Sequence, residues 1–269
     1  MSDVESLVQA GSGTPITVRG RSIAYGPPPW RMHGRTLALR YRLTDPDEAR
    51  RHVPAGLEMD EDPVVRARFW DMRHDALRSL GDGEAAWTPF REAVIAFPVR
   101  RGALSGDYPT YMYADDFAYT AMGREVMGWP VRDGIISVDP EPSTGPAAGT
   151  TLSARLVRDG AELMHIDMTL TGARLADGDT RPPRWLATKI IPDATRPLAS
   201  VAQLLETGPE RIHRRTIWAA DASLRLGVGE GDELHYLEPR EIVSAEYWND
   251  VDLTIGWATV LDELGASPW

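Results

Sequence analysis

The sequence predicts an α+β protein in which an antiparallel sheet, closed into a barrel or a sandwich, dominates over a few short helices. Several runs alternate between apolar and polar residues, which is the pattern of half-buried strands. Glycine and proline, 24 and 21 of the 269 residues, interrupt the chain often, and few helical patterns remain. We see no internal repeat and no alternation of strands with helices, which argues against a doubly wound nucleotide-binding sheet.

The length of the chain suits one large domain or two small ones, and β-rich domains of this size usually stay whole. The first 30 residues are polar and contain Gly11-Ser12-Gly13 and Pro27-Pro28-Pro29, a composition typical of a loop. We therefore predict a loosely structured lead-in over residues 1–30 and a single domain over residues 31–269.

In the first half of the chain, alternation predicts strands over residues 36–43, 64–72 and 91–100. Between the first two of these strands, Thr44 is expected to cap a short helix that runs from Asp45 to Val53. Pro46 suits the first turn of this helix, and Pro54 closes it.

The clearest hairpin joins the runs Gly149–Arg158 and Ala161–Ala173 through Asp159-Gly160. Asp-Gly supplies the positive φ angles that a tight primed turn requires. Further strands are expected over residues 215–226, 234–237 and 241–255, and a final short helix over residues 257–264.

Composition and charge exclude several classes of partner. The formal net charge of −11 argues against a nucleic-acid partner, since nucleic-acid binders present clustered basic surface. We find no apolar run of the length that crosses a membrane, and no basic and apolar start typical of a signal peptide, so we expect a cytoplasmic protein. The chain has no cysteine, and Lys189 is its single lysine. Only one side chain can therefore form an imine.

Polar clusters elsewhere do not predict a metal or phosphate site. His165 and Asp167 alternate on one strand face, but no third ligand follows at a recognisable spacing. Asp115-Asp116 is insufficient for a calcium or magnesium site. The segment Gly227–Gly231 is glycine-rich, yet it is acidic and opens no helix, so we interpret it as a loop. The sequence therefore predicts no metal centre.

Three segments, in order and at similar spacing, resemble the acetoacetate decarboxylase family, and the likeness covers most of residues 30–260. They are His33-Gly34-Arg35-Thr36 with Val53-Pro54-Ala55-Gly56-Leu57-Glu58; Thr88-Pro89-Phe90-Arg91-Glu92-Ala93; and Tyr111-Met112-Tyr113-Ala114-Asp115-Asp116 leading to Gly123-Arg124-Glu125-Val126-Met127-Gly128-Trp129-Pro130. A weaker fourth match is Lys189-Ile190-Ile191-Pro192. The resemblance implies an antiparallel β-barrel core, a homo-oligomer and no cofactor.

The family's imine-forming lysine follows the proline of the third segment, and a second lysine comes directly after it. This sequence has Val131 and Arg132 at those two positions. Valine cannot form an imine, and arginine stays protonated and is not a practical nucleophile. The resemblance therefore implies a relative without the usual covalent decarboxylase mechanism.

The same resemblance implies the other site residues. Glu92 matches an acid/base glutamate, and Arg35 matches an arginine that binds the substrate carboxylate. With Arg132, Arg35 would hold an anion and stabilise an enolate. The substrate pocket is expected to include Val131, Trp129, Met112, Tyr113, Arg68 and Lys189. Each has a plain structural alternative: surface ion pairs for the charged residues and ordinary core packing for the others.

These residues favour an enzyme that acts on a small keto acid or β-dicarbonyl compound by non-covalent acid/base chemistry. We expect a dehydration, hydration, cyclisation or aldol-type exchange in natural-product biosynthesis, in which Glu92 would move the proton. Two alternatives stay open: an imine-free decarboxylation of a β-keto acid, in which cations stabilise the carbanion, and a binding protein without turnover. Replacement of the missing nucleophile by Lys189 also stays open.

Overall fold

The computed structural model describes residues 25, 28–74, 87–140, 145–175, 178–179 and 184–265. Most of the predicted lead-in, residues 1–30, lies outside the described residues. Tyr25 belongs to the described part: it is buried, and its hydroxyl donates a hydrogen bond to Glu125 at 2.6 Å. None of the described helices combines the length and the hydrophobicity needed to cross a membrane.

The described part of the chain is mostly β-structure with few helices. The strands are β1 (Trp30–Leu43), β2 (Val64–His74), β3 (Thr88–Arg101), β4 (Leu104–Ala114), β5 (Val131–Asp133), β6 (Ile135–Asp139), β7 (Thr151–Arg158), β8 (Ala161–Leu175), β9 (Gly178–Asp179), β10 (Trp185–Pro192), β11 (Ala199–Thr207), β12 (Pro209–Leu226), β13 (Pro239–Ile255) and β14 (Thr259–Glu263). The helices are α1 (Pro46–Arg51), α2 (Phe117–Glu125) and the 3₁₀-helix η1 (Leu234–Leu237).

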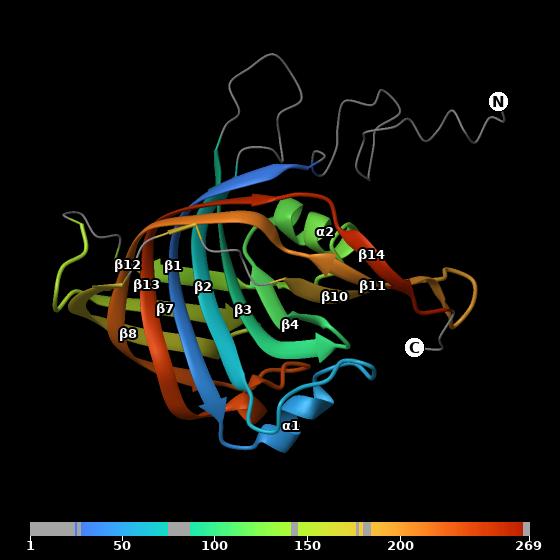
Figure 1. Ribbon diagram of the computed structural model, residues 1–269, viewed down its shortest axis with the longest axis horizontal. Helices are drawn as coiled ribbons and strands as arrows, with labels where there is room; N and C mark the ends of the chain where they lie inside the picture. The colour runs from blue at the N-terminus through green and yellow to red at the C-terminus, as the bar shows by residue number, and fades with distance from the viewer. Residues whose placement is uncertain are drawn as a thin grey trace, which may run out of the picture.

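The strands form one sheet in the order β14-β11-β10-β4-β3-β2-β1-β13-β12-β8-β7-β6, with β5 paired to β4 and β9 to β12. The long strands in the middle of this order curve strongly, and α1 and α2 lie at opposite ends of them (Figure 1). The two terminal strands of the order, β14 and β6, are not paired with each other in the described sheet. The predicted antiparallel β-sheet is therefore present, but its closure into a barrel is not confirmed.

Both faces of the central strands are buried, because side chains alternate between them. Leu37, Leu39 and Phe69 pack into one hydrophobic cluster. Ala38 and Trp70, their neighbours in the sequence, pack into the other. We call these the first face and the second face. A residue's face follows from its position along the strand and from the pairing register, so the register decides which polar side chains meet.

Several predicted elements are confirmed with small shifts. Strands β1, β2 and β3 contain the predicted runs, and β7 and β8 form the predicted hairpin. Asp159 and Gly160 in its turn have φ angles of 50° and 81°, as a primed turn requires. Helix α1 is present, but Asp45 rather than Thr44 is its N-cap, since the Asp45 carboxylate accepts the N–H groups of residues 47 and 48.

Two predicted elements were wrong in type. Residues 234–237 form the 3₁₀-helix η1 rather than a strand; Leu234 and Leu237, three residues apart, are both fully buried, which is the spacing of one 3₁₀ turn. Residues 259–263 form β14 rather than a helix, because they pair antiparallel with the neighbouring strand β11. That pairing joins segments far apart in sequence, which local patterns do not reveal.

Helix α2 was not predicted from the sequence. It connects β4 to β5, and these two strands run parallel. Asp116 is its N-cap and accepts the backbone N–H of Tyr119 at 2.8 Å. This small strand–helix–strand unit carries Tyr119 and Val131 onto the second face of the sheet.

Candidate active site

Glu92 is a carboxyl group inside the protein, on β3 between Trp70 of β2 and Ala114 of β4. The residue is only 3% exposed. One carboxylate oxygen, Oε2, accepts a hydrogen bond from the Tyr119 hydroxyl, and the other, Oε1, has no partner among the described residues. Burial raises the pKa of Glu92 from 4.5 to about 7, while the Tyr119 hydroxyl and the nearby Arg68 guanidinium oppose that shift. A carboxyl group with such a pKa can both take up and release protons near neutral pH.

Tyr119 is held rigidly above this carboxyl group. It lies in α2, is buried, and stacks on Phe90 with ring centroids 4.5 Å apart. The ring of Trp129 lies 6.2 Å away on another side. The Trp129 indole N–H donates to the Thr207 hydroxyl at 2.8 Å, which fixes the orientation of that ring. Aromatic packing therefore fixes the position of Tyr119, the hydrogen-bond partner of Glu92.

A small cavity of about 20 Å³ adjoins Glu92 and Tyr119. Its walls are aromatic and apolar: Met32, Trp70, Met72, Phe90, Trp129, Trp185, Pro209, Leu253 and Ile255. This volume is about that of one water molecule. Aromatic walls around a single carboxyl group remove solvent from it, which is the physical cause of its raised pKa.

The pairing register brings further predicted residues onto the face of Glu92. One row of paired positions runs from Ala38 through Arg68, Val94 and Met112 to Val131. The neighbouring row is Thr36, Trp70, Glu92 and Ala114. The structure therefore places Arg68, Met112 and Val131 on the same second face as Glu92, one row away from it.

Val131 is fully buried against α2. A Cβ atom added to Gly123 would lie 2.8 Å from Val131 Cγ2, closer than real contacts allow, so the glycine makes room for the valine. The sequence therefore fits Val131 tightly at this position. Met112, paired with it on β4, is also fully buried.

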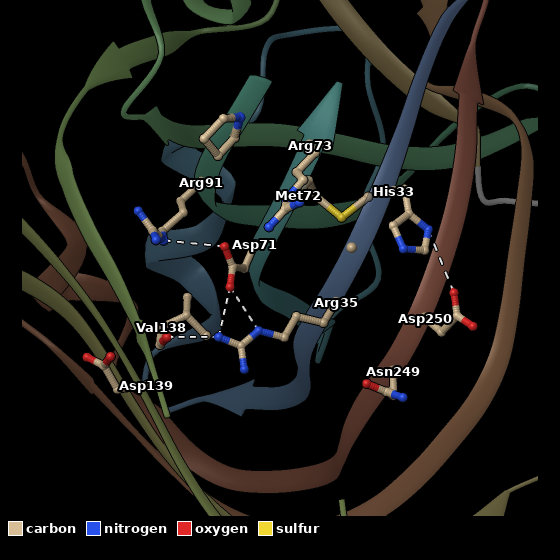
Figure 2. Close-up of a pocket in the computed structure, with 12 residues that line it drawn as sticks. His33, Arg35, Asp71, Met72, Arg73, Arg91, Val138, Asp139, Asn249 and Asp250 are labelled. Atoms are coloured by element: carbon tan, nitrogen blue, oxygen red, sulfur yellow. Dashed lines mark hydrogen bonds and ion pairs between the residues drawn. The ribbon is translucent and has the colours of Figure 1, made fainter. Parts of the chain in front are cut away.

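Arg35, which the resemblance predicts to bind the substrate carboxylate, lies on the first face, opposite to the face of Glu92. It pairs with Asp71, which pairs with Arg91, the neighbour of Glu92 in sequence. Its Nε donates to Asp71 at 2.8 Å, and its two terminal nitrogens donate to the carbonyl oxygens of Pro140 at 2.8 Å and Val138 at 3.0 Å. Figure 2 shows Arg35, Asp71 and Arg91 together at a cavity of about 550 Å³. The guanidinium joins β1 and β2 to β6.

Arg132 and Tyr113 also lie on the first face, because each alternates with a second-face residue, Val131 and Met112. The Tyr113 hydroxyl and an Arg132 nitrogen both donate to the buried carboxylate of Asp232, each at 2.6 Å. Arg158 donates to the same carboxylate at 2.8 Å. The structure therefore does not bring Glu92, Arg35 and Arg132 together, since strand alternation separates the first from the other two.

Lys189 lies on β10, four residues after Trp185 and on the same side of the strand. Its backbone lies close to Gly128, in the turn that ends the sequence motif: a Cβ added to Gly128, which has φ of 68°, would lie 2.8 Å from Lys189 Cα. Burial lowers the pKa of Lys189, and the nearby Glu125 opposes this. The lysine does not line the cavity beside Glu92.

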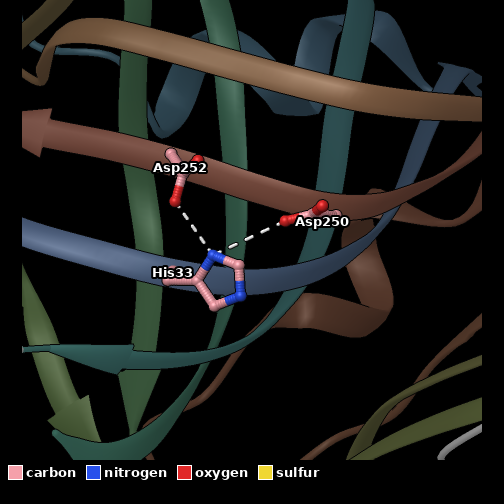
Figure 3. A group of neighbouring side chains, drawn as sticks. All are labelled: His33, Asp250 and Asp252. Atoms are coloured by element: carbon pink, nitrogen blue, oxygen red, sulfur yellow. Dashed lines mark hydrogen bonds and ion pairs between the residues drawn. The ribbon is translucent and has the colours of Figure 1, made fainter.

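One group of potential metal ligands exists among the described residues, His33, Asp250 and Asp252, which sequence reasoning did not find (Figure 3). His33 Nδ1 lies 2.9 Å from Asp252 Oδ1 and 3.7 Å from Asp250 Oδ1. Arg215 pairs with the other oxygen of both carboxylates, at 3.4 and 3.0 Å. Ion pairs account for this surface cluster, and we assign no metal to it.

Sequence reasoning missed the aromatic residues that surround Glu92, above all Tyr119, Trp70 and Trp185. The available signal for Tyr119 was Asp116, an N-cap residue three positions ahead of it. The pattern of buried residues after that cap, with Ala118, Tyr119, Ala121 and Met122 inside, is that of an amphipathic helix. No comparable local signal exists for Trp70, which is paired with Glu92 on the neighbouring strand β2, or for Trp185, which reaches the cavity from β10.

Comparisons with known proteins agree with this fold. The family model of acetoacetate decarboxylase matches residues 13–264. The acetoacetate decarboxylase of Burkholderia multivorans is 32% identical over 97% of both chains, and that of Ralstonia nicotianae is 28% identical over 96% of this chain and 97% of its own.

Solved structures show the same fold. An acetoacetate decarboxylase-like enzyme from Sphingomonas wittichii RW1 matches with a TM-score of 0.79 and 21% identity, covering 95% of this chain and 100% of its own. The enduracididine biosynthesis enzyme MppR, complexed with pyruvate, matches with a TM-score of 0.76 and 23% identity over 95% of this chain and 99% of its own.

Proposed function

The chain belongs to the acetoacetate decarboxylase family, and from this premise we propose that it is an enzyme that transforms a small keto acid or β-dicarbonyl compound by acid/base chemistry without an imine at position 131. The observation that carries the proposal is the buried Glu92 carboxyl group, with a pKa of about 7, on the same face of the sheet as Val131. Glu92 supplies the chemistry that remains when the amine is absent.

The absence of the imine at this position rests on the residue itself. The sequence motif that ends in Trp129-Pro130 is followed by valine, and Val131 is fully buried on the same face of the sheet as Glu92. A hydrocarbon side chain cannot attack a carbonyl group, so the electron sink of a covalent mechanism is missing there. The swap also makes this part of the pocket less polar, which suits a more hydrophobic substrate.

Glu92 then acts on a carbon atom next to a carbonyl group. Its carboxylate takes a proton from that carbon, the C–H electron pair forms the enolate, and the negative charge moves to the carbonyl oxygen. The resulting carboxylic acid returns the proton to a leaving hydroxyl group or to another carbon. This sequence supports dehydration, cyclisation or aldol-type bond exchange. Tyr119 holds one oxygen of Glu92 and leaves Oε1 free for the substrate.

Decarboxylation of a β-keto acid is the second candidate, because the related proteins from Ralstonia and Burkholderia are acetoacetate decarboxylases by name. Without an imine, a cation would have to stabilise the carbanion directly. The pyruvate in the MppR complex and the biosynthetic role in that enzyme's name support a keto acid substrate and a place in natural-product biosynthesis. Assembly as a homo-oligomer belongs to the same proposal.

The test combines trapping with product analysis. The protein is incubated with pyruvate, acetoacetate and a β-diketone, reduced with borohydride, and weighed as the intact chain. We expect no increase in the mass of the chain after reduction. We expect a dehydrated, cyclised or aldol-type product to form without release of carbon dioxide, and Glu92→Gln to lose most of the turnover. Added mass that disappears in Lys189→Ala would assign the imine to Lys189 and refute the non-covalent mechanism.

Two further outcomes separate the alternatives. Release of carbon dioxide from acetoacetate without trapped mass would establish the imine-free decarboxylase. Thermal stabilisation by these compounds without any product would establish a binding protein. A Glu92→Gln variant that turns substrate over as fast as the native protein would remove Glu92 from the mechanism.

A further inference from the structure

Arg68 is a buried cation for which the described residues provide no hydrogen-bond or ion-pair partner. The residue is 8% exposed and lies on the second face of β2, one row from Glu92. Its guanidinium carbon lies 5.6 Å from the centroid of the Trp248 ring. Burial lowers the pKa of Arg68, and the carboxylates of Asp107, Glu92 and Glu246 oppose this.

The neighbouring carboxylates are engaged elsewhere. Asp107 is hydrogen-bonded to Arg66, which lies two residues before Arg68 on the same face of β2. Glu246 accepts the indole N–H of Trp248 at 2.6 Å. Glu92 accepts the Tyr119 hydroxyl. Arg66 therefore has a carboxylate of its own, whereas Arg68 has several at longer range and none in direct contact.

Among the described residues, the polar atoms on this face that are buried without a hydrogen-bond partner include Thr36 Oγ1, Trp70 Nε1 and Glu92 Oε1. Their residues are paired with one another in a single row, the one adjacent to Arg68. A buried polar group without a partner is costly, and a buried charge without one is more so, so native proteins rarely leave several of them together. Donors and acceptors gathered in this way indicate a binding site, in which a ligand would supply the missing hydrogen-bond partners.

We propose that Arg68 binds the carboxylate of the substrate, with the Trp70 indole N–H as a second donor, and so directs the adjacent carbonyl group towards Glu92. This inference rests on the proposed function and adds the anion site that it requires. An arginine fork matches a carboxylate in two parallel hydrogen bonds. Diagonal neighbours on paired strands lie roughly 7–8 Å apart, which suits two functional groups of one small molecule.

The substrate class follows from this arrangement. It is a monocarboxylate whose carbonyl group is attached to the carboxyl carbon or separated from it by one carbon, as in 2-oxo and 3-oxo acids. The rest of the molecule meets tryptophan and phenylalanine rings and is therefore apolar or flat. Because the cavity holds only about 20 Å³, binding must displace aromatic side chains, which gives an optical signal.

The test measures binding by tryptophan fluorescence and does not depend on turnover. Pyruvate and acetoacetate are compared with their uncharged methyl esters in the Glu92→Gln protein, in which the proposed function predicts binding without reaction. In that background Arg68→Met should weaken binding of both acids at least 30-fold and leave the esters unchanged. Arg68→Lys keeps the charge but loses the two-pronged guanidinium, so its affinity for the acids should lie between those of the parent protein and of Arg68→Met.

Arg35→Lys is the matched control, since Arg35 is an equally buried arginine on the opposite face. Its binding of the acids should equal that of the parent protein. Equal binding of acid and ester by the parent protein, binding of neither acid, or unchanged acid binding in Arg68→Met would each overturn the proposal. Loss of acid binding in Arg35→Lys but not in Arg68→Lys would assign the anion site to Arg35 instead.

Stability separates a ligand-binding role from a structural one. Arg68→Met removes a buried charge without a direct partner, so its thermal midpoint should equal or exceed that of the native protein. Arg66→Met leaves Asp107 buried without its cation, and its midpoint should fall. A midpoint for Arg68→Met that falls as far as that of Arg66→Met would refute the anion-site role. Failure of Glu92 as the catalytic group would show in turnover, whereas failure of Arg68 as the anion site would show in binding of the acids and in the thermal midpoint.

Discussion

The free energy of unfolding of Glu92→Gln, compared with that of the native protein, should increase from acid to alkaline pH. Glutamine has nearly the shape of glutamate but does not ionise. In the folded protein, burial raises the pKa of Glu92 from 4.5 to about 7. The folded state therefore holds this proton more tightly than the unfolded state does. Its stabilising effect is complete below pH 4.5 and is lost as the pH rises to about 7.

The magnitude follows from the size of the shift. One pKa unit corresponds to about 1.4 kcal/mol, so ionisation of Glu92 should lower the free energy of unfolding by roughly 2–3 kcal/mol between pH 5 and pH 8. The residue is only 3% exposed, so solvent screening reduces this figure little. Glutamine does not ionise, so the free energy of unfolding of Glu92→Gln does not fall in this way. The difference between the variant and the native protein should therefore rise by that amount from pH 5 to pH 8.

Urea denaturation at fixed protein concentration, followed by tryptophan fluorescence at pH 5, 6, 7 and 8, measures this difference. Any constant cost of the amide group cancels when the pH values are compared. Glu241→Gln, at a side chain that is 61% exposed, controls for the loss of one charge. A difference between Glu92→Gln and the native protein that stays constant to within about 0.5 kcal/mol from pH 5 to pH 8 would refute the buried-carboxyl reasoning.

Three more predictions concern the same region. Tyr119→Phe removes a hydrogen bond that holds the pKa of Glu92 down, so the pH profile of kcat/KM should move up by about one unit; an unmoved profile would contradict this. Val131→Lys should create a borohydride-trapped adduct with pyruvate at residue 131, found by peptide mapping and absent in Val131→Met. Gly128→Ala should lower the free energy of unfolding by about 1–3 kcal/mol more than Gly160→Ala, because both have positive φ but only the first meets a neighbouring strand.

Local sequence patterns predicted the parts of the fold that local physics fixes. Alternation in residues 64–72 matches β2, and Asp159-Gly160 forms the expected turn. The strand over 259–263 was mistaken for a helix because its stability comes from pairing with β11. Helix α2 has only nine residues, too few for its periodicity to stand out, and its N-cap Asp116 belongs to the segment that carries the family resemblance.

The sequence by itself determined which chemistry is available. It has one lysine, no cysteine, and a valine after Trp129-Pro130, and its resemblance to a known family singled out Glu92. These facts depend on residue identity alone. They already exclude an imine at position 131 and a thiol nucleophile.

Only the tertiary structure decided which charged residues lie on the same face of the sheet as Glu92. Arg35 and Arg68 are both buried arginines near it in the sheet, and the sequence favoured Arg35. The register pairs Arg35 with Asp71 and places Arg68 one row from Glu92 on the same face. Successive side chains on a strand point to opposite faces, so a shift of one residue in the pairing would exchange their roles. That register is set by contacts between β1, β2 and β3 across more than 30 residues of chain, as in the pairing of Arg35 with Asp71 at a separation of 36.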